Sequence, residues 1–151
     1  MSDPHWLDSE QQRHWRTFLM GAWSLFNGLE RDLEEATGLS MNEYEVLVRL
    51  SEAPEQVLRM SALADQVVAS RSRLTHTIRR MEAEGLVSRR RCPDDRRGVE
   101  CLLTEEGMAT LEAAAPQHVA SVRARLVDVV SAEEFATLGN IFDQVLGRIS
   151  R

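Results

Sequence analysis

The sequence contains no lysine, only two cysteines and no long apolar stretch. Two cysteines are too few for the disulfide framework that stabilises small secreted domains. No apolar run approaches the ~20 residues that a membrane-spanning helix needs. The first residues, Met1 to Asp8, lack the basic start and the apolar core of a signal peptide. These absences predict a cytoplasmic protein that has no membrane partner.

Enzyme motifs and metal-binding motifs are lacking as well. The sequence has no glycine-rich phosphate loop, no nucleophile elbow and no paired catalytic carboxylates. Its four histidines, His5, His14, His76 and His118, lie far apart and without ligand spacing. We therefore expect no catalytic residues, no metal site and no cofactor.

The charge is distributed unevenly along a chain of ordinary globular composition, 43% hydrophobic and 28% charged. The formal net charge is −6, and all 18 basic residues are arginine. Residues 71–97 hold nine arginines and four acidic residues, so this segment carries +5 and the remainder carries −11. Contact with phosphate depends on a local cationic surface rather than on the total charge. The segment therefore predicts a surface that binds phosphate groups.

Apolar periodicity and capping residues predict six helices. Capping boxes begin at Ser9, Ser40 and Ser131, and single caps are expected at Ser61 and Ser70. The expected helical ranges are 9–37, 40–53, 61–67, 71–84, 105–130 and 131–149. Pro116 should kink the helix expected at 105–130.

Two short strands complete the pattern. The segments 86–91 and 99–103 flank a turn rich in proline, aspartate and glycine, which predicts a β-hairpin. A short helix, a tight turn, a second helix and a basic hairpin together form a winged helix-turn-helix. The predicted fold is a single domain, 1–151, that is mostly α with a small β-hairpin wing; residues 40–104 form the DNA-binding lobe. The long terminal helices, 9–37 and 105–151, carry more apolar surface than this lobe can cover, so we expect them to be dimerisation helices.

The helix expected at 71–84 separates apolar from polar residues. Leu74, Ile78 and Met81 share one face, while arginine and short polar residues occupy the rest. Such side chains read base edges in a major groove, and the start of a helix suits phosphate oxygens. A solvated arginine-rich face is the alternative interpretation. The expected DNA contacts of this helix are Ser70, Arg71, Ser72, Arg73, Thr75, His76, Arg79 and Arg80.

The segments 60–89 and 94–107 carry the most specific motif. A helix-turn-helix pattern is followed by Asp-x-Arg, here Asp95 and Arg97, six residues before the pair Leu103-Thr104. Together these segments resemble the MarR family of winged helix-turn-helix regulators. The resemblance implies that Arg97 enters the minor groove while Asp95 holds the wing in shape; an Arg97 that only pairs with Asp95 is the alternative. The expected wing residues are Arg89, Arg90, Arg91, Asp95, Arg96 and Arg97, with at least one of the first three on phosphate and another paired with Glu82 or Glu84.

The resemblance also implies a small aromatic or phenolic effector. Plain core packing is the alternative for the aromatic side chains, and a surface position is the alternative for the histidine. Cys101 shares strand parity with Val99 and is expected in the core, whereas Cys92 begins the wing turn and is expected to be exposed. The candidate effector residues are His14, Trp15, Arg16, Trp23 and Tyr44.

These features predict a homodimeric repressor that binds a pseudo-palindromic double-stranded DNA operator and is released by a small aromatic ligand. Two alternatives remain open at this point. One is a winged helix that binds an acidic protein and no operator. The other is a thiol-sensing regulator that acts through Cys92.

Overall fold

The computed structural model describes residues 6–67, 71–95 and 97–149, and the described chain divides into two compact units. The winged lobe comprises residues 32–119, and the helical unit comprises residues 1–31 and 120–151. Two helices, α1 (Ser9–Thr37) and α5 (Glu105–Val122), continue from one unit into the other. The prediction of a mostly helical fold with a small β wing is confirmed.

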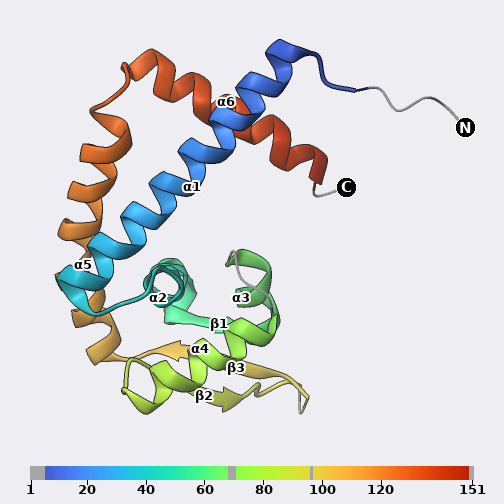
Figure 1. Ribbon diagram of the computed structural model, residues 1–151. Helices are drawn as coiled ribbons and strands as arrows, with labels where there is room; N and C mark the ends of the chain where they lie inside the picture. The colour runs from blue at the N-terminus through green and yellow to red at the C-terminus, as the bar shows by residue number, and fades with distance from the viewer. Residues whose placement is uncertain (1–5, 68–70, 96, 150–151) are drawn as a thin grey trace, which may run out of the picture. The chain divides into compact units, whose positions relative to one another are not determined.

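The winged lobe contains the central helices and the sheet (Figure 1). Its elements are α2 (Met41–Glu52), a 3-10 turn (Pro54–Gln56), β1 (Val57–Arg59), α3 (Met60–Gln66), α4 (Arg71–Ala83), β2 (Val87–Arg91) and β3 (Val99–Leu103). In the described residues the strands form an antiparallel sheet in the order β1-β3-β2. The predicted hairpin is β2–β3, and α4 is the second helix of the helix-turn-helix.

The strand β1 was not predicted. It has three residues, which is too short for the alternation of apolar and polar side chains that identifies a strand in a sequence. Val57 pairs with Leu102 and Leu58 pairs with Cys101, so β1 depends on the hairpin for its hydrogen bonds. The pairing places Arg59 opposite Glu100, next to the wing.

The core of the winged lobe is built from α2, α3, α4 and the sheet. Leu74, Ile78 and Met81 of α4 are buried, as the helical periodicity predicted. They belong to one hydrophobic cluster with Leu50 of α2 and Leu63 of α3. Burial of these side chains fixes which face of α4 points to the core, and the opposite face is left to solvent.

Two of the predicted helix caps are correct and two are wrong. Ser40 and Ser131 form capping boxes with the residues three positions later, Glu43 and Glu134. The cap of α1 is Asp8 instead of Ser9: the Asp8 carboxylate accepts from the Gln11 amide at 2.8 Å, and the Gln11 side chain accepts from the Asp8 amide at 3.0 Å. The sequence offers two overlapping capping boxes, one that begins at Asp8 and one that begins at Ser9. Helix α3 begins directly after β1 with Arg59 as its N-cap, so Ser61 lies inside the helix.

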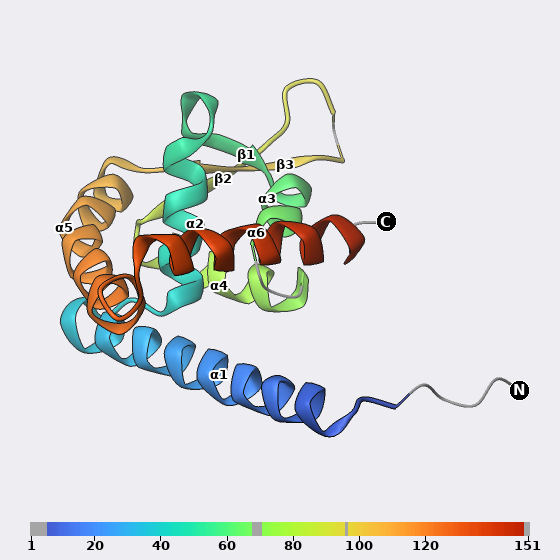
Figure 2. The ribbon, with the colours of Figure 1, turned by 90° about the horizontal axis from the view of Figure 1, so that it is seen from above.

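The helical unit contains the long part of α1 and the last helix, α6 (Ala132–Ile149). These two helices cross (Figures 1 and 2), and Phe18 lies 5.8 Å from Phe142 between ring centroids. The helix that follows the wing stays α-helical through Pro116 and changes to a π-helical segment at Arg123–Val127, earlier than the predicted end near 130. Among the described helices, none is long and apolar enough to cross a membrane.

Candidate nucleic-acid interface

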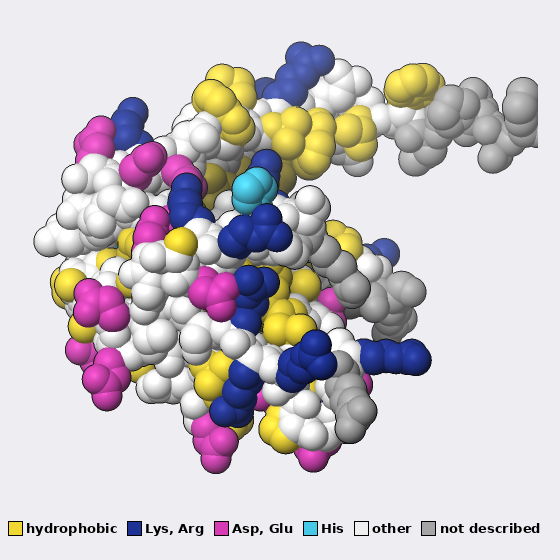
Figure 3. Space-filling view, turned by 90° about the horizontal axis from the view of Figure 1, so that it is seen from below, with side chains coloured by type: hydrophobic (Ala, Val, Ile, Leu, Met, Phe, Trp, Pro, Cys, Tyr) yellow, Lys and Arg dark blue, Asp and Glu magenta, His cyan; other side chains and the backbone are white. Residues whose placement is uncertain are grey.

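The exposed face of α4 holds six of the residues expected to contact DNA. Ser72, Arg73, Thr75, His76, Arg79 and Arg80 are all exposed. Ser70 lies outside the described residues, and so does the side chain of Arg71, although the backbone of α4 begins there. Arginine side chains gather with histidine on the face of the molecule shown in Figure 3. The partition of α4 into an apolar face and a cationic face is therefore as predicted.

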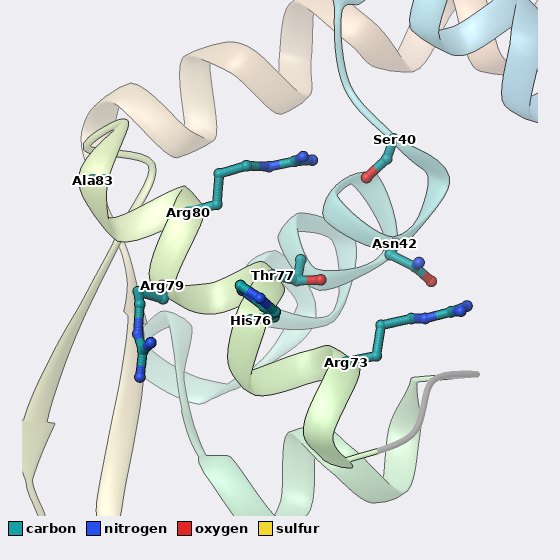
Figure 4. A pocket seen from close by; sticks show the side chains of 8 residues that line it. All are labelled: Ser40, Asn42, Arg73, His76, Thr77, Arg79, Arg80 and Ala83. Carbon is teal, nitrogen blue, oxygen red and sulfur yellow. The ribbon is translucent and has the colours of Figure 1, made fainter.

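Helix α4 borders two depressions of the surface. The larger one has a volume of about 640 Å³ and lies between α4 and the start of α2 (Figure 4). Its lining combines Ser40, the N-cap of α2, and Asn42 of α2 with Arg73, His76, Thr77, Arg79, Arg80 and Ala83 of α4. The smaller one, about 300 Å³, is lined by Ser72, Thr75, His76 and Arg79. His76 and Arg79 line both depressions, so they lie along the ridge of the cationic face.

One arginine of this face is held by a buried carboxylate. Arg80 Nε donates to Glu43 Oε1 at 2.7 Å, and Arg80 Nη2 lies 2.5 Å from the same oxygen. The other oxygen, Glu43 Oε2, accepts from the Ser40 amide at 2.9 Å and from the Ser40 hydroxyl at 3.0 Å. The hydrogen bond to Glu43 and the charge of its carboxylate raise the pKa of Arg80. Glu43 was predicted only as a capping residue, because its partner is 37 positions away in the sequence.

Two arginines of the wing strand β2 are also paired. Arg89 donates from its backbone amide and from its guanidinium to Glu82 of α4, at distances of 2.6–3.1 Å. This hydrogen bonding lowers the pKa of Glu82, because it stabilises the carboxylate. Arg90 donates to Glu100 of β3 at 2.8 Å, and these two residues face each other in the ladder. The Glu82 partner was among the predicted possibilities, and it attaches the wing to α4.

The turn of the wing is organised by Asp95. Its carboxylate accepts from the Arg97 amide at 3.0 Å and lies 3.6 Å from the guanidinium of Arg59 on β1. Within the described part of the chain, no carboxylate pairs with the Arg97 guanidinium, and Arg97 is exposed. The side chain of Arg91 is exposed too, whereas Arg96 lies outside the described residues. Asp95 thus fixes the backbone of the turn and leaves the side chain of Arg97 directed to solvent.

Both cysteines are buried free thiols, so the expectation of an exposed Cys92 is wrong. The Cys92 side chain is turned inward, and its amide donates to the Gly98 carbonyl at 3.0 Å. A Cβ atom added at Gly98 would lie 2.6 Å from Cys92 Sγ, which shows how closely the thiol is covered. Cys101 lies in the core as predicted, and burial raises the pKa of its thiol to about 12.

The candidate effector residues are divided between the two units. His14, Trp15, Arg16 and Trp23 lie on α1 in the helical unit and are exposed. Trp15 stacks on Phe18 with ring centroids 5.7 Å apart. Tyr44 is buried in the winged lobe, 4.6 Å from the ring of His118.

The rings of Tyr44 and His118 are in contact, and the pKa values of both residues are shifted. Burial raises the pKa of Tyr44 and lowers that of His118. His118 Nδ1 is buried and has no hydrogen-bond partner among the described residues. Across residues 6–67, 71–95 and 97–149, no group of three or more histidine, cysteine, aspartate or glutamate side chains is placed to hold a metal ion.

Known proteins resemble this chain in sequence and in fold. Residues 39–99 match the MarR family. The MarR family regulator AbsC from Streptomyces coelicolor is 42% identical, with a TM-score of 0.91 over 97% of this chain and 98% of AbsC. Sco3205 from the same organism, a MarR family regulator solved in complex with DNA, is 38% identical, with a TM-score of 0.92 over 97% of this chain and 91% of Sco3205. The HTH-type regulator YdgJ of Bacillus subtilis is 30% identical over 78% of this chain and 70% of YdgJ. The chain belongs to the MarR family, and it is a DNA-binding transcriptional regulator rather than an enzyme.

Proposed function

We propose that this regulator binds a pseudo-palindromic operator as a homodimer and represses transcription until a small aromatic acid or phenol releases it. The observation that carries the proposal is the cationic face of α4 beside a wing whose turn presents Arg97 to solvent. The similarity to Sco3205, which was solved in complex with DNA, supports DNA binding by this chain.

The proposed contacts are of two kinds, those to base edges and those to phosphate oxygens. Helix α4 enters the major groove, where Arg73 and His76 meet base edges and Arg79 meets a phosphate. The start of α4 meets phosphate oxygens through backbone amides, towards which the helix dipole attracts negative charge. Arg97 at the tip of the wing enters the minor groove, where a guanidinium is attracted by the negative potential of a narrow groove. Repression then follows if the operator overlaps a promoter, because bound protein excludes the polymerase.

The proposed dimer rests on the apolar surface of the helical unit. Phe26 on α1 is 65% exposed, and Trp23 of the same helix is 72% exposed. Helix α6 exposes a further apolar row that includes Ile141, Val145 and Ile149. Exposed apolar surface of this extent marks an interaction site. In a twofold dimer, the same apolar surface of a second copy would cover it. A twofold dimer would present its two α4 helices to half-sites about one helical turn apart.

The proposed effector acts by differential affinity. A ligand releases the operator only if it binds better to a dimer whose recognition helices are wrongly spaced for DNA. A tenfold loss of operator affinity requires ~1.4 kcal/mol of such coupling. Trp15 and Trp23 supply exposed aromatic rings on α1, and Arg16 of the same helix supplies a cation for a carboxylate.

Selection of DNA from a random duplex library tests the proposal. We expect a pseudo-palindromic duplex to be enriched, its affinity to fall steeply with salt, and a scrambled duplex to bind weakly. Sedimentation equilibrium at micromolar concentration should give a dimer. Binding without sequence preference would favour the protein-interaction alternative, and a monomer would exclude the twofold arrangement. Titration with aromatic acids tests release, and peroxide treatment of the wild type and Cys92→Ser distinguishes ligand control from thiol control.

A further inference from the structure

Arg80 differs from its exposed neighbour Arg79 because a buried carboxylate holds its guanidinium. The side chain of Arg80 is 59% exposed, whereas that of Glu43 is 2% exposed. Both guanidinium contacts use Glu43 Oε1, and both Ser40 contacts use Glu43 Oε2. The carboxylate therefore connects the last turn of α4 with the first turn of α2, and its burial keeps it out of reach of DNA.

This connection supplies a directional constraint that the apolar core does not supply. Packing of Leu74, Ile78 and Met81 fixes the buried face of α4, but hydrophobic contact is not directional and tolerates small rotations and shifts. A charge-assisted contact through two guanidinium nitrogens is short and directional. The carboxylate is itself fixed, because it caps the start of α2, where the helix dipole favours a negative charge. Arg80 thus ties α4 to a rigid point on its neighbour.

We infer that Arg80 is a positioning residue and not a DNA contact: together with Glu43 it sets the orientation in which α4 presents Arg73, His76 and Arg79. This inference rests on the proposed binding of operator DNA by α4. Arg79 is the matched comparison, because it is adjacent in the sequence, is exposed and pairs with no carboxylate among the described residues.

The first test measures operator affinity against salt concentration, with the duplex enriched from the random library. We expect Arg80→Ala and Glu43→Gln each to weaken binding roughly fivefold or more, and the double variant to be no weaker than the weaker single variant. Neither substitution should change the slope of log affinity against log salt, because neither removes a phosphate contact. Arg79→Ala should instead reduce the magnitude of that slope by about one unit per lost contact per subunit.

Arg80→Lys adds a conservative variant that keeps the positive charge. A lysine retains most of a phosphate contact but cannot reproduce the two-nitrogen contact with Glu43, so we expect Arg80→Lys to remain weakened. The inference is overturned if Arg80→Lys binds like the wild type and Arg80→Ala lowers the salt slope. It is also overturned if Glu43→Gln leaves affinity unchanged or raises it, because release of the guanidinium and loss of a negative charge would favour a direct contact.

Hydrogen exchange of the free protein tests the connection without DNA. Arg80→Ala and Glu43→Gln should accelerate amide exchange in α4 and in the first turn of α2, and Arg79→Ala should leave both unchanged. Unchanged protection in the first two variants rejects the inference even if no duplex is enriched. If protection falls but no duplex is enriched, the proposed function fails while the positioning contact of Arg80 stands.

Discussion

Where the wing strands meet α5, the packing leaves no room for a methyl group at Gly107. Gly107 lies in the first turn of α5, where a Cβ atom would be 2.0 Å from the carbonyl oxygen of Leu86 and 2.8 Å from Leu103 Cδ1. That carbonyl is held in place, because it accepts from the Thr104 amide at 3.2 Å and lies 2.9 Å from the Thr104 hydroxyl, which also contacts the Gly85 carbonyl at 2.6 Å. The same hydroxyl accepts from the Gly107 amide at 3.0 Å. The substitution Gly107→Ala must therefore displace backbone rather than a flexible side chain.

The size of the effect follows from these contacts. A carbon and a carbonyl oxygen normally approach to roughly 3.3–3.6 Å, so α5 or the Leu86 carbonyl must move by more than about 1 Å. Overpacking of this kind costs about 1–3 kcal/mol. The movement also weakens the hydrogen bonds to Thr104, each worth about 1 kcal/mol. Alanine recovers about 0.5–1 kcal/mol through its higher helix propensity. We expect Gly107→Ala to lower the free energy of unfolding by about 2–4 kcal/mol.

Gly21→Ala is the matched control for this substitution. Gly21 also lies inside a helix, but a Cβ atom there meets no described atom within 4 Å. Only the propensity gain remains, so Gly21→Ala should raise the free energy of unfolding by about 0.5–1 kcal/mol. Urea unfolding at one fixed protein concentration measures both variants and removes the effect of mass action in a dimer. Equal stability of Gly107→Ala and the wild type would refute the argument from close packing.

Three further predictions concern the DNA contacts and the pH dependence of stability. Arg97→Ala should reduce operator affinity and the magnitude of the salt slope, by about one unit per lost contact per subunit, while the melting temperature barely changes; a large drop in melting temperature with normal binding would indicate a bracing role. Arg73→Ala should weaken specific binding by ~1–3 kcal/mol and relax the preference at one operator position, as binding to single-base variants of the duplex would show. Burial lowers the pKa of His118, so the unfolded chain binds its proton more readily than the folded chain. The stability that this provides is complete above the ordinary pKa of about 6.5 and declines as the pH falls below it. His118→Phe should flatten the decline below that pH, and an unchanged pH profile would contradict the assignment.

The features that the sequence predicted correctly are those that repeat over several turns or pair within a short distance. Leu74, Ile78 and Met81 recur over two turns of one helix, so the periodicity alone identifies the buried face of α4. The hairpin follows from two strands on either side of one turn. The short strand β1 gives no such repeat, and Cys92 was assigned to solvent because turn residues usually are exposed, whereas its thiol packs beneath Gly98.

The partners of the arginines could be predicted only where they are local. Once the hairpin register is known, Arg90 and Glu100 are directly opposed, and Glu82 lies within reach of β2 because α4 leads directly into that strand. The pair of Arg80 and Glu43 joins two helices that are brought together only by the fold. A capping box identifies Glu43 as a local acceptor, but nothing in its own segment indicates that a second helix supplies the remaining donors.

These pairs explain how a chain with a net charge of −6 presents a cationic surface. Glu43 is 2% exposed and Glu100 is 16% exposed, while their partners Arg80 and Arg90 are 59% and 51% exposed. The carboxylates lie beneath the guanidinium groups, so an approaching phosphate meets positive charge first. Because these carboxylates are buried, a count of surface charges predicts the wrong direction for the change in DNA affinity when one of them is neutralised. Neutralising Glu43 makes the surface more positive, yet it weakens the contact that fixes the direction of Arg80. We therefore expect weaker operator binding rather than stronger.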